Sequence, residues 1–322
     1  MGRYIIRRLL WVVFVLLVIS FITYFIFFKL PPGDPATRFA GKQPTPALIA
    51  EVKKQFGLDK PFVVQYALFV KRVFLGDEYG WPGLGKSFNT RSPLKPIILE
   101  RLGVTAQLAF GAALVWISIG IPIGILSALK PRSLGDRMAM GFALFGVSAP
   151  VFWLGQMFLY LFWFKLKWAA GSGFRSLGTY GFFTWANHMI MPWVVLALLF
   201  AAFYARMSRG NLIETMSEDY IRTARAKGLT ERRVVLRHGL RSSLTPLVTM
   251  IGMDLGALLG GAIITETVFN LPGIGAYVIQ SVVGNDFNAI LDVTVVAALA
   301  ITLMNLLVDV IYAYLDPRVR YT

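Results

Sequence analysis

The sequence predicts an all-α integral membrane protein whose chain crosses the bilayer as six helices. Hydrophobic residues make up 56% of the 322 positions and charged residues only 15%, which is too apolar for a soluble domain of this length. Six apolar runs approach or exceed the roughly 20 residues that a spanning helix needs. These runs lack the alternation of barrel strands, so a closed barrel is not expected.

The six predicted spans carry few charges. They cover residues 9–30, 104–129, 138–164, 189–205, 245–265 and 293–315. The second and third are uncharged, whereas Lys29, Asp254 and Asp309 interrupt the first, fifth and sixth. The first run exceeds the apolar part of a signal peptide, and Leu30 is followed by Pro-Pro-Gly-Asp rather than by small residues. An uncleaved first helix is therefore favoured over a cleaved signal peptide.

Lys and Arg are distributed unevenly between the connecting segments, and this bias predicts the orientation. Both termini and the loop after the second span are basic, and residues 206–241 contain nine cations. The segments 165–188 and 270–292 contain three and none. Both termini are therefore expected in the cytoplasm. The net charge of +15 follows this topology, so anionic lipid is a simpler partner than nucleic acid.

The long segment 31–103 is expected outside the membrane, as a partly helical cap. Thr45 and Pro46 are typical of a helix start and Gly57 of a helix end, which predicts a helix over Pro46–Phe56. Residues 61–75 repeat the pattern, with Pro61 at the start and Gly76 past the end. Residues 76–96 are rich in Gly, Pro, Ser and Asn and predict a loop.

Residues 80–87, G-W-P-G-L-G-K-S, match the phosphate-binding pattern G-x-x-x-x-G-K-S/T. A phosphate-binding loop follows a buried strand and opens a helix, so that backbone N–H groups converge on phosphates. Residues 72–79 do not predict a strand, and two prolines in 88–96 argue against a helix. The expected position outside the membrane also separates Lys86 from cytoplasmic ATP. Nucleotide binding is not expected at this loop.

The cytoplasmic segment 207–244 is expected to be structured. Ser217 is a candidate N-cap, with Glu218 and Asp219 in a first helical turn, where acids suit the helix dipole. Gly228 ends this helix after about ten residues, and Thr230 caps the next one. A short cationic helix between two spans can dock into a partner protein, or it can lie on lipid headgroups. The pattern alone does not separate these two readings.

The same loop carries a resemblance to a known family. Residues 219–229 read D-Y-I-R-T-A-R-A-K-G-L, followed by H-G-L-R at 238–241 and by Pro246. This resembles the E-A-A-x-x-x-G loop of ABC importer permeases, with matches at Ala224 and Gly228 and departures at Arg222 and Thr223. The stretches P-G-D-P at 32–35, E-T-V-F-N-L-P-G-I-G at 266–275 and D-P-R-V-R at 316–320 look like the dipeptide, oligopeptide and nickel subfamily. Residues 76–88 look longer than usual.

The resemblance covers the whole chain and implies a type I ABC importer permease of one domain, 1–322. It implies that this chain is half of a pathway for peptides or similar solutes in a bacterial or archaeal plasma membrane. The implied partners are a second homologous permease, two cytoplasmic ATPase subunits that hold ATP and Mg, and an external solute-binding protein. This chain is then no enzyme and holds no cofactor.

The resemblance also implies that the helix near 218–227 docks into a groove on the ATPase and transmits its closure. The residues expected to serve ATPase coupling are Tyr220, Arg222, Ala224, Arg225, Lys227 and Gly228. Tyr220 and Ala224 lie four apart and share a helix face, which makes them candidate contacts. The three cations can pair with acids on the ATPase or remain solvated. Gly228 permits a tight turn.

Polar groups within the predicted spans are candidates for a translocation pathway. A carboxylate such as Asp254, roughly 13 Å into the fifth span, is costly in lipid and is a functional-site hypothesis by default. Glu266 is expected near the outer end of the same helix, and Asn305 and Asp309 lie four apart on the last span. Each can line a wet pathway or pair with a neighbouring helix.

Small and helix-breaking residues also mark the spans. Gly252, Gly256 and Gly260 recur every four residues, a stripe that permits close helix packing or a gate hinge. Kinks are expected at three prolines in the spans, namely Pro122, Pro150 and Pro192.

Two other function classes fit the sequence less well. The chain lacks the groups that an intramembrane enzyme would need, since it has no Cys, no H-E-x-x-H and no G-x-S-x-G motif. Its two histidines, His188 and His238, are expected on opposite sides of the membrane, so no metal site is predicted. An autonomous channel or ion-coupled transporter would use the buried acids, but no inverted repeat is visible.

Overall fold

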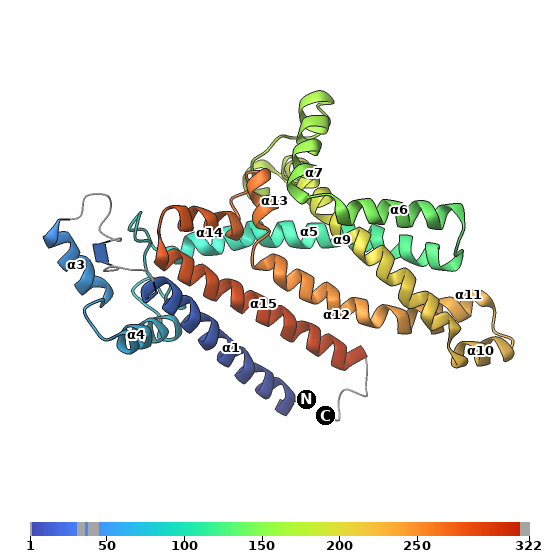
Figure 1. The fold of residues 1–322 in the computed structure, drawn as a ribbon, viewed down its shortest axis with the longest axis horizontal. Coiled ribbons are helices and arrows are strands. Elements are labelled where there is room, and N and C mark those ends of the chain that lie inside the picture. The colour runs from blue at the N-terminus through green and yellow to red at the C-terminus, as the bar shows by residue number, and fades with distance from the viewer. Residues whose placement is uncertain (1, 31–35, 38–44, 316–322) are drawn as a thin grey trace. The chain divides into compact units, whose positions relative to one another are not determined.

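The computed structural model describes residues 2–30, 36–37 and 45–315, and these form helices joined by loops (Figure 1). The P-G-D-P and D-P-R-V-R stretches lie outside the described residues. The chain divides into two compact units, each described by itself. Unit 1 comprises Met1–Thr105, Leu259–Ile263 and Pro272–Leu303, and unit 2 comprises Ala106–Leu258, Ile264–Leu271 and Met304–Thr322.

Unit 1 is built around the first span and the start of the last one. Its elements are α1 (Gly2–Phe28), α3 (Pro46–Phe56), α4 (Phe62–Leu75), the start of α5 (Leu94–Leu129), α14 (Ile274–Val283) and most of α15 (Phe287–Leu315). Tyr24 of α1 packs with Phe69 of α4 and Leu291 of α15 in one buried cluster. The two short helices predicted in 31–103 are confirmed, and both end at glycines with positive φ.

Unit 2 contains the remaining helices. They are most of α5, α6 (Leu134–Ser148), α7 (Val151–Phe158) with a π-helical continuation (Leu159–Lys165), α8 (Leu177–Tyr180), α9 (Phe182–Ser217), α10 (Asp219–Ala226), α11 (Glu231–Arg233) with a π-helical continuation (Val234–Gly239), α12 (Leu240–Leu259) and most of α13 (Ile263–Val268). Of the most apolar window of α9, 56% is buried, so α9 is a central helix of this unit. The corresponding value for α1 in unit 1 is 17%, which leaves most of α1 exposed for lipid.

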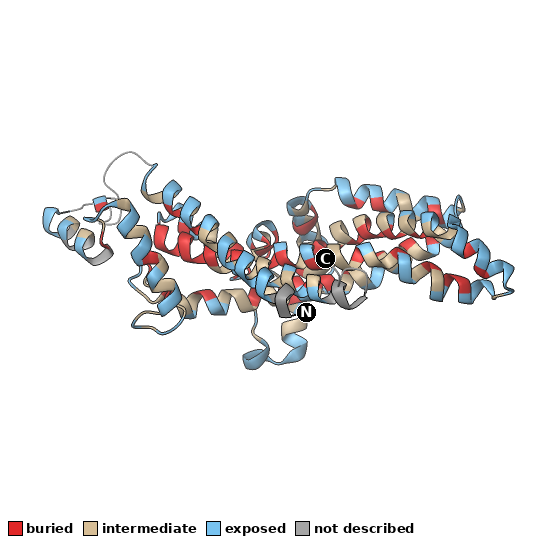
Figure 2. Cartoon of the chain, turned by 90° about the horizontal axis from the view of Figure 1, so that it is seen from below, coloured by how far each residue is buried: buried red, intermediate tan, exposed pale blue. Residues whose placement is uncertain are grey.

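Burial follows helix faces rather than whole helices. Figure 2 shows buried residues as stripes along the helices, with exposed residues on the opposite faces. Many exposed side chains are large and apolar, such as Leu10, Phe14 and Leu126. A helix that is apolar on both its buried and its exposed face is suited to a bilayer, because lipid rather than water contacts the exposed face.

The third predicted span, 138–164, differs from the structure. Helix α6 and the helix Val151–Lys165 are bent by 103° relative to one another, with the break between Ser148 and Val151. Ala149 has an extended backbone, and Pro150 precedes the second helix. A proline disfavours helical geometry at the residue before it, which explains the break. The described residues therefore contain five helices long enough to span, or six if this bent pair is one span.

The fifth predicted span, 245–265, is also interrupted. Helix α12 ends at Leu259, and α13 begins only at Ile263. Gly261 between them has a φ of +123°, and a Cβ there would lie 2.7 Å from the Cα of Gly275. A close backbone approach therefore stops the helix where the hydropathy continues. The expectation that Glu266 lies on the same helix as Asp254 is wrong.

Several element boundaries also move. Helices α5 and α9 extend well beyond 104–129 and 189–205, and α15 begins before residue 293. Helix α14 lies inside the segment 270–292, for which the sequence predicted only a connection between two spans. Of the three prolines at which kinks are expected, Pro150 lies at a break in the helix, whereas Pro122 and Pro192 lie inside the continuous helices α5 and α9.

Candidate coupling site and membrane groups

Helix α10 lies in the folded loop that connects α9 to α12. Glu218, not Ser217 as predicted, occupies the N-cap position; Ser217 ends α9, and its hydroxyl donates to the Glu214 carbonyl at 2.6 Å. Asp219 lies in the first turn, where a negative charge suits the helix dipole. At the other end Gly228 has a φ of +76°, and no atom lies within 4 Å of the position of a Cβ.

The inner face of α10 packs against the chain itself. Ile221 and Ala224 form a buried cluster with Val234, and Met216 and Leu229 pack against it. Ile221 and Val234 are both 0% exposed. This cluster joins α10 to the π-helical segment that leads into α12, so the loop has a small core of its own.

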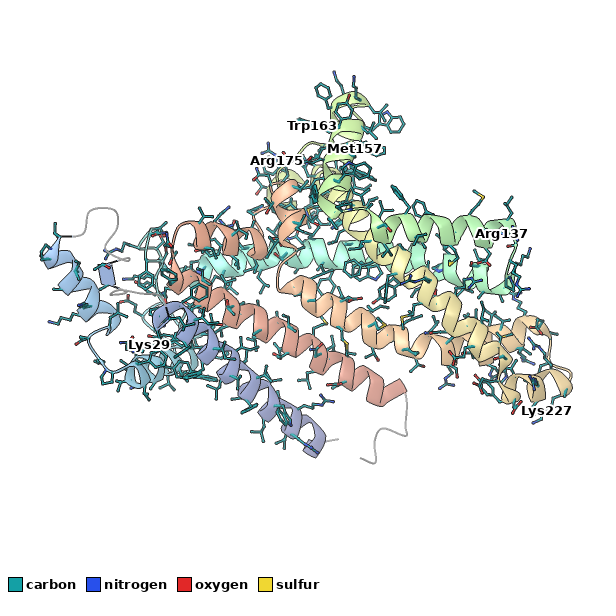
Figure 3. The ribbon with its side chains drawn as sticks, viewed as in Figure 1. Lys29, Arg137, Met157, Trp163, Arg175 and Lys227 are labelled. Carbon is teal, nitrogen blue, oxygen red and sulfur yellow. The ribbon has the colours of Figure 1, made fainter. Side chains whose placement is uncertain are left out.

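The outer face of α10 is polar and accessible. Tyr220 is 43% exposed. Arg222 pairs with Asp219 at 3.3 Å but keeps 73% of its side-chain surface. Lys227 projects at the tip of the loop (Figure 3). Tyr220 is thus accessible to a partner, whereas Ala224, which was predicted to share its contact face, is only 7% exposed and supports the loop from within.

Arg225 is bound within the chain. Its guanidinium donates to both oxygens of Glu231, from Nε at 3.0 Å and from Nη2 at 2.7 Å. The hydrogen bond to this carboxylate raises the pKa of Arg225 above its usual value. A bidentate pair of this kind fixes the geometry between α10 and α11. Arg225 therefore braces the loop in the isolated chain.

A third ion pair, which the sequence did not indicate, ties α6 to α9. Asp136 accepts from Arg209 Nε at 2.6 Å, from Arg209 Nη2 at 2.9 Å, and also from the Ser127 hydroxyl. The Arg132 backbone N–H donates to the same carboxylate at 2.8 Å. Asp136 is 4% exposed. The pair could not be predicted from the sequence, because the two residues lie 73 positions apart in the chain.

Asp254 of α12 is hydrogen-bonded to α9. Tyr204 Oη donates to Asp254 Oδ2 at 2.6 Å, and the Tyr204 ring stacks on Trp116 with centroids 6.2 Å apart. Tyr204 is fully buried and Asp254 half-buried. The structure therefore shows pairing with a neighbouring helix. A pathway role for Asp254 stays a prediction.

The other predicted membrane groups lie in three different settings. Glu266 is fully buried on α13, and its carbonyl accepts from the Leu271 N–H at 2.8 Å. Asn305 is exposed and Asp309 half-buried on α15. Their predicted place along a pathway remains a prediction.

The predicted glycine stripe is only partly realised. A Cβ at Gly252 would overlap the Val308 side chain, so α12 and α15 pack closely at this point in unit 2. Gly256 is buried on the same helix. Gly260 lies beyond the end of α12, so the stripe does not continue onto a third turn. Close packing is the supported reading at Gly252.

Unit 1 contains a buried acid that the sequence did not reveal as such. Asp292 is 0% exposed and accepts from Arg72 Nη2 at 3.1 Å. The same Arg72 nitrogen donates to Asn288 Oδ1 at 3.2 Å. In the sequence, Asp292 is the last residue of the segment that precedes the predicted span 293–315. The sequence did not indicate that α15 already begins at Phe287. This start places Asp292 inside the helix, about one turn after Asn288.

The loop that matches the phosphate-binding pattern has a different structure. Helix α4 precedes it, and the next helix after Ser87 begins only at Leu94. Lys86 pairs with Glu78 at 2.9 Å and lies 5.1 Å from the centre of the Tyr79 ring. Across residues 75–94 neither the preceding strand nor the following helix of a phosphate site is present. Within the described residues no three His, Asp or Glu side chains are grouped to hold a metal.

In the described part of the chain, five or six helices long and apolar enough to span a membrane, with a folded loop helix between two of them, define the class of multi-pass helical membrane proteins. The chain belongs to the family described as the binding-protein-dependent transport system inner membrane component, whose profile matches residues 120–321. The corresponding N-terminal profile of binding-protein-dependent transport membrane components matches residues 1–109. The sequence resemblance is thereby confirmed.

Relatives match over nearly their whole lengths. The chain is 37% identical over 340 residues to the dipeptide transport system permease protein DppB of Alkalihalophilus pseudofirmus, with full coverage of both chains. It is 38% identical to the glutathione transport system permease protein GsiC of Salmonella typhimurium, also with full coverage. It is 39% identical to the probable D,D-dipeptide transport system permease protein DdpB of Escherichia coli, covering 92% of this chain and 91% of the relative.

Solved structures share the fold. An inward-facing MetNI methionine ABC transporter matches with a TM-score of 0.56 and 20% identity, covering 69% of this chain and 98% of the other. An amino acid ABC transporter crystallised with histidines matches with a TM-score of 0.50 and 15% identity, covering 70% and 94%. The all-α fold of a type I ABC importer permease is therefore confirmed.

Proposed function

We propose that this chain forms half of the translocation pathway of an ATP-driven importer for peptides or related small solutes. Relatives that are 37–39% identical bear names of dipeptide and glutathione permeases, which supports this class of cargo. The other half is a second, homologous permease. An external solute-binding protein delivers the cargo, and two cytoplasmic ATPase subunits hold ATP and Mg.

The single observation that carries the coupling proposal is the two-faced structure of α10. Its inner face is anchored by Ile221 and Ala224, while Tyr220, Arg222 and Lys227 remain accessible on the outside. A short rigid helix with a cationic outer face suits a groove with acidic walls on the ATPase. Arg225 and Gly228 fix the shape of the loop rather than contact the partner.

The proposed orientation places both termini and α10 in the cytoplasm of a bacterial or archaeal cell, with 31–103 outside. Arg137 and Lys227 both lie toward the same end of unit 2 (Figure 3), as expected if the α5–α6 turn and the loop helix share the positive side of the membrane. Asp254, Glu266, Asn305 and Asp309 are proposed to line the pathway between the two faces.

The test replaces Gly228 by valine in the assembled transporter. Gly228 has a φ of +76°, which a β-branched residue adopts only under strain, although nothing obstructs its side chain. Gly181 is a matched control, because its φ is +78° and its Cβ position is equally open. We expect both variants to reach the membrane, but only Gly228→Val to lose ATP-dependent uptake of a labelled dipeptide.

Two results would count against the proposal. Normal uptake by Gly228→Val would remove the coupling role of the loop. Flux through the chain reconstituted alone, without any ATPase, would favour an autonomous channel or ion-coupled transporter instead.

A further inference from the structure

Unit 1 contains a polar cavity of about 440 Å³ beside the first turns of α5 and the helix α14. Its volume falls within the range of small-molecule sites. The side chains that matter for its chemistry are Ser87, Glu100, Arg101, Tyr277, Ser281 and Asp286. Pro272, from the stretch 266–275 that resembles the peptide-permease subfamily, also lines it.

Two buried polar atoms of this cavity have no hydrogen-bond partner: Arg101 Nη1 and Ser281 Oγ. Ser281 is only 4% exposed. Buried polar atoms in native proteins are almost always bonded, so each such atom requires an explanation, and an absent ligand is one. The two atoms come from α5 and α14 and line one cavity, which makes a shared ligand the economical explanation.

The Arg101 guanidinium is held in place by an aromatic ring. Its central carbon lies 4.4 Å from the centre of the Tyr277 ring. This contact orients the planar group, while the buried Nη1 donor stays without a partner. A guanidinium that is held in place and has an unused donor is suited to a carboxylate, to which it donates charge-assisted hydrogen bonds.

The two acids of the cavity differ in availability. Asp286 is engaged, because the Ser87 hydroxyl, the Phe88 N–H at 3.1 Å and the Ala289 N–H at 3.2 Å all donate to it. It therefore forms part of the wall. Glu100 is exposed at the cavity lining, so its carboxylate can meet a cationic group.

We propose that this cavity binds a small zwitterionic solute, with its carboxylate on Arg101 and Ser281 and its ammonium group on Glu100. The proposal deepens the proposed importer function and rests on it. A free dipeptide carries both charged ends and fits the available volume. The site would then select for cargo with free termini, within the permease itself rather than in the binding protein.

The first experiment uses the unaltered full-length chain, purified without ATPase or binding protein. Binding of labelled alanyl-alanine is measured to concentrations of about 10 mM, since sites in a pathway release their cargo and millimolar dissociation constants are expected. N-acetyl-alanyl-alanine lacks the ammonium group, and alanyl-alanine amide lacks the carboxylate. We expect saturable binding of alanyl-alanine, and binding about tenfold or more weaker for each analogue.

The second experiment changes the cavity. Arg101→Gln is expected to weaken alanyl-alanine binding by about 10- to 100-fold, since a hydrogen bond to a charged group is lost. Glu100→Gln should weaken alanyl-alanine but leave the N-acetyl analogue unaffected. Arg175→Gln is the matched control, because Arg175 lies 4.7 Å from the Tyr180 ring centre and bonds its hydroxyl at 2.9 Å, outside any lining of this cavity.

The proposal is overturned if the unaltered chain shows no saturable binding, or if Arg101→Gln binds as the unaltered chain does. Equal binding of the two analogues and of alanyl-alanine would also overturn it. Uptake assays on the same variants distinguish a failure of the proposed binding site from a failure of the proposed importer function. Normal ATP-dependent uptake without binding at this cavity would leave the importer function standing and remove only the site.

Discussion

The ion pair between Asp136 and Arg209 predicts a large, non-additive effect on stability. Asp136 receives four donors, of which Arg209 supplies two, at 2.6 and 2.9 Å. The substitution Arg209→Met nearly keeps the side-chain length. The Asp136 carboxylate, whose side chain is only 5% exposed, then keeps just two donors, the Ser127 hydroxyl and the Arg132 N–H. A buried charge then remains without its counter-charge.

The expected magnitude follows from this burial. Removing one partner of a buried pair costs about 3–5 kcal/mol. Because the Arg209 side chain keeps 27% exposure and two other donors remain, we expect the lower end, about 3 kcal/mol, for Arg209→Met. Once Asp136 is replaced by asparagine, the loss of Arg209 should cost much less. The two substitutions should therefore be coupled by about 2 kcal/mol.

The assay is unfolding of the purified chain in mixed micelles with increasing SDS, for both single variants and the double variant. Arg222→Met is the matched control, since its pair with Asp219 is exposed and should contribute at most about 0.5 kcal/mol. A cost below about 1 kcal/mol for Arg209→Met, or strictly additive single effects, would refute the reasoning.

Four further predictions test other parts of the fold. Gly120→Ala should destabilise the chain by about 1–3 kcal/mol in the same SDS assay, because the new Cβ would lie 2.7 Å from the Ala201 carbonyl oxygen. Gly210→Ala is the control, since its Cβ would meet open space, and it should stabilise the chain by up to about 1 kcal/mol. Equal effects of the two substitutions would contradict the close approach of α5 and α9. Ile221→Ala should loosen the α10 core by about 2–4 kcal/mol and reduce co-purification of the ATPase subunits, which an unchanged pull-down would disprove. Tyr204→Phe should leave Asp254 without its 2.6 Å donor and change uptake more than ATPase binding; an unaltered uptake rate would show the bond to be dispensable. Lys86→Ala should leave ATP-dependent uptake unchanged, whereas nucleotide crosslinking mapped to Lys86 would restore the phosphate-site reading.

The number and approximate places of the spans could be predicted because hydropathy measures what lipid selects for. The helix ends near Gly57, Gly76 and Gly228 could also be predicted, since a positive φ leaves a signature in residue type. The kink expected at Pro150 is a bend of 103°, and the break near Gly261 was not predicted. Hydropathy continues across both, and the backbone turns for reasons of local geometry and packing.

The candidate site was predicted in outline, and its inner organisation was not. Residue spacing placed Tyr220 and Ala224 on one helix face, but it could not show that Val234, ten residues beyond Ala224, would bury Ala224 while Tyr220 stays exposed. The pairing of Asp136 with Arg209 likewise joins residues 73 positions apart. Partners so distant in sequence leave no local pattern in a single chain.

The arrangement of α9, α10 and α12 suggests how a push on the loop helix would reach the membrane interior. Only Glu218 separates α9 from α10, and the buried contact of Ile221 with Val234 fastens α10 to the segment that continues into α12. A displacement of α10 must therefore move the ends of both helices. The same two helices are joined inside the bundle by the hydrogen bond from Tyr204 to Asp254. Relative sliding of α9 against α12 would break that bond, whereas a joint movement would preserve it. The bond therefore favours the two helices moving as one body, and it places an acid of the proposed pathway on the element that the ATPase would move.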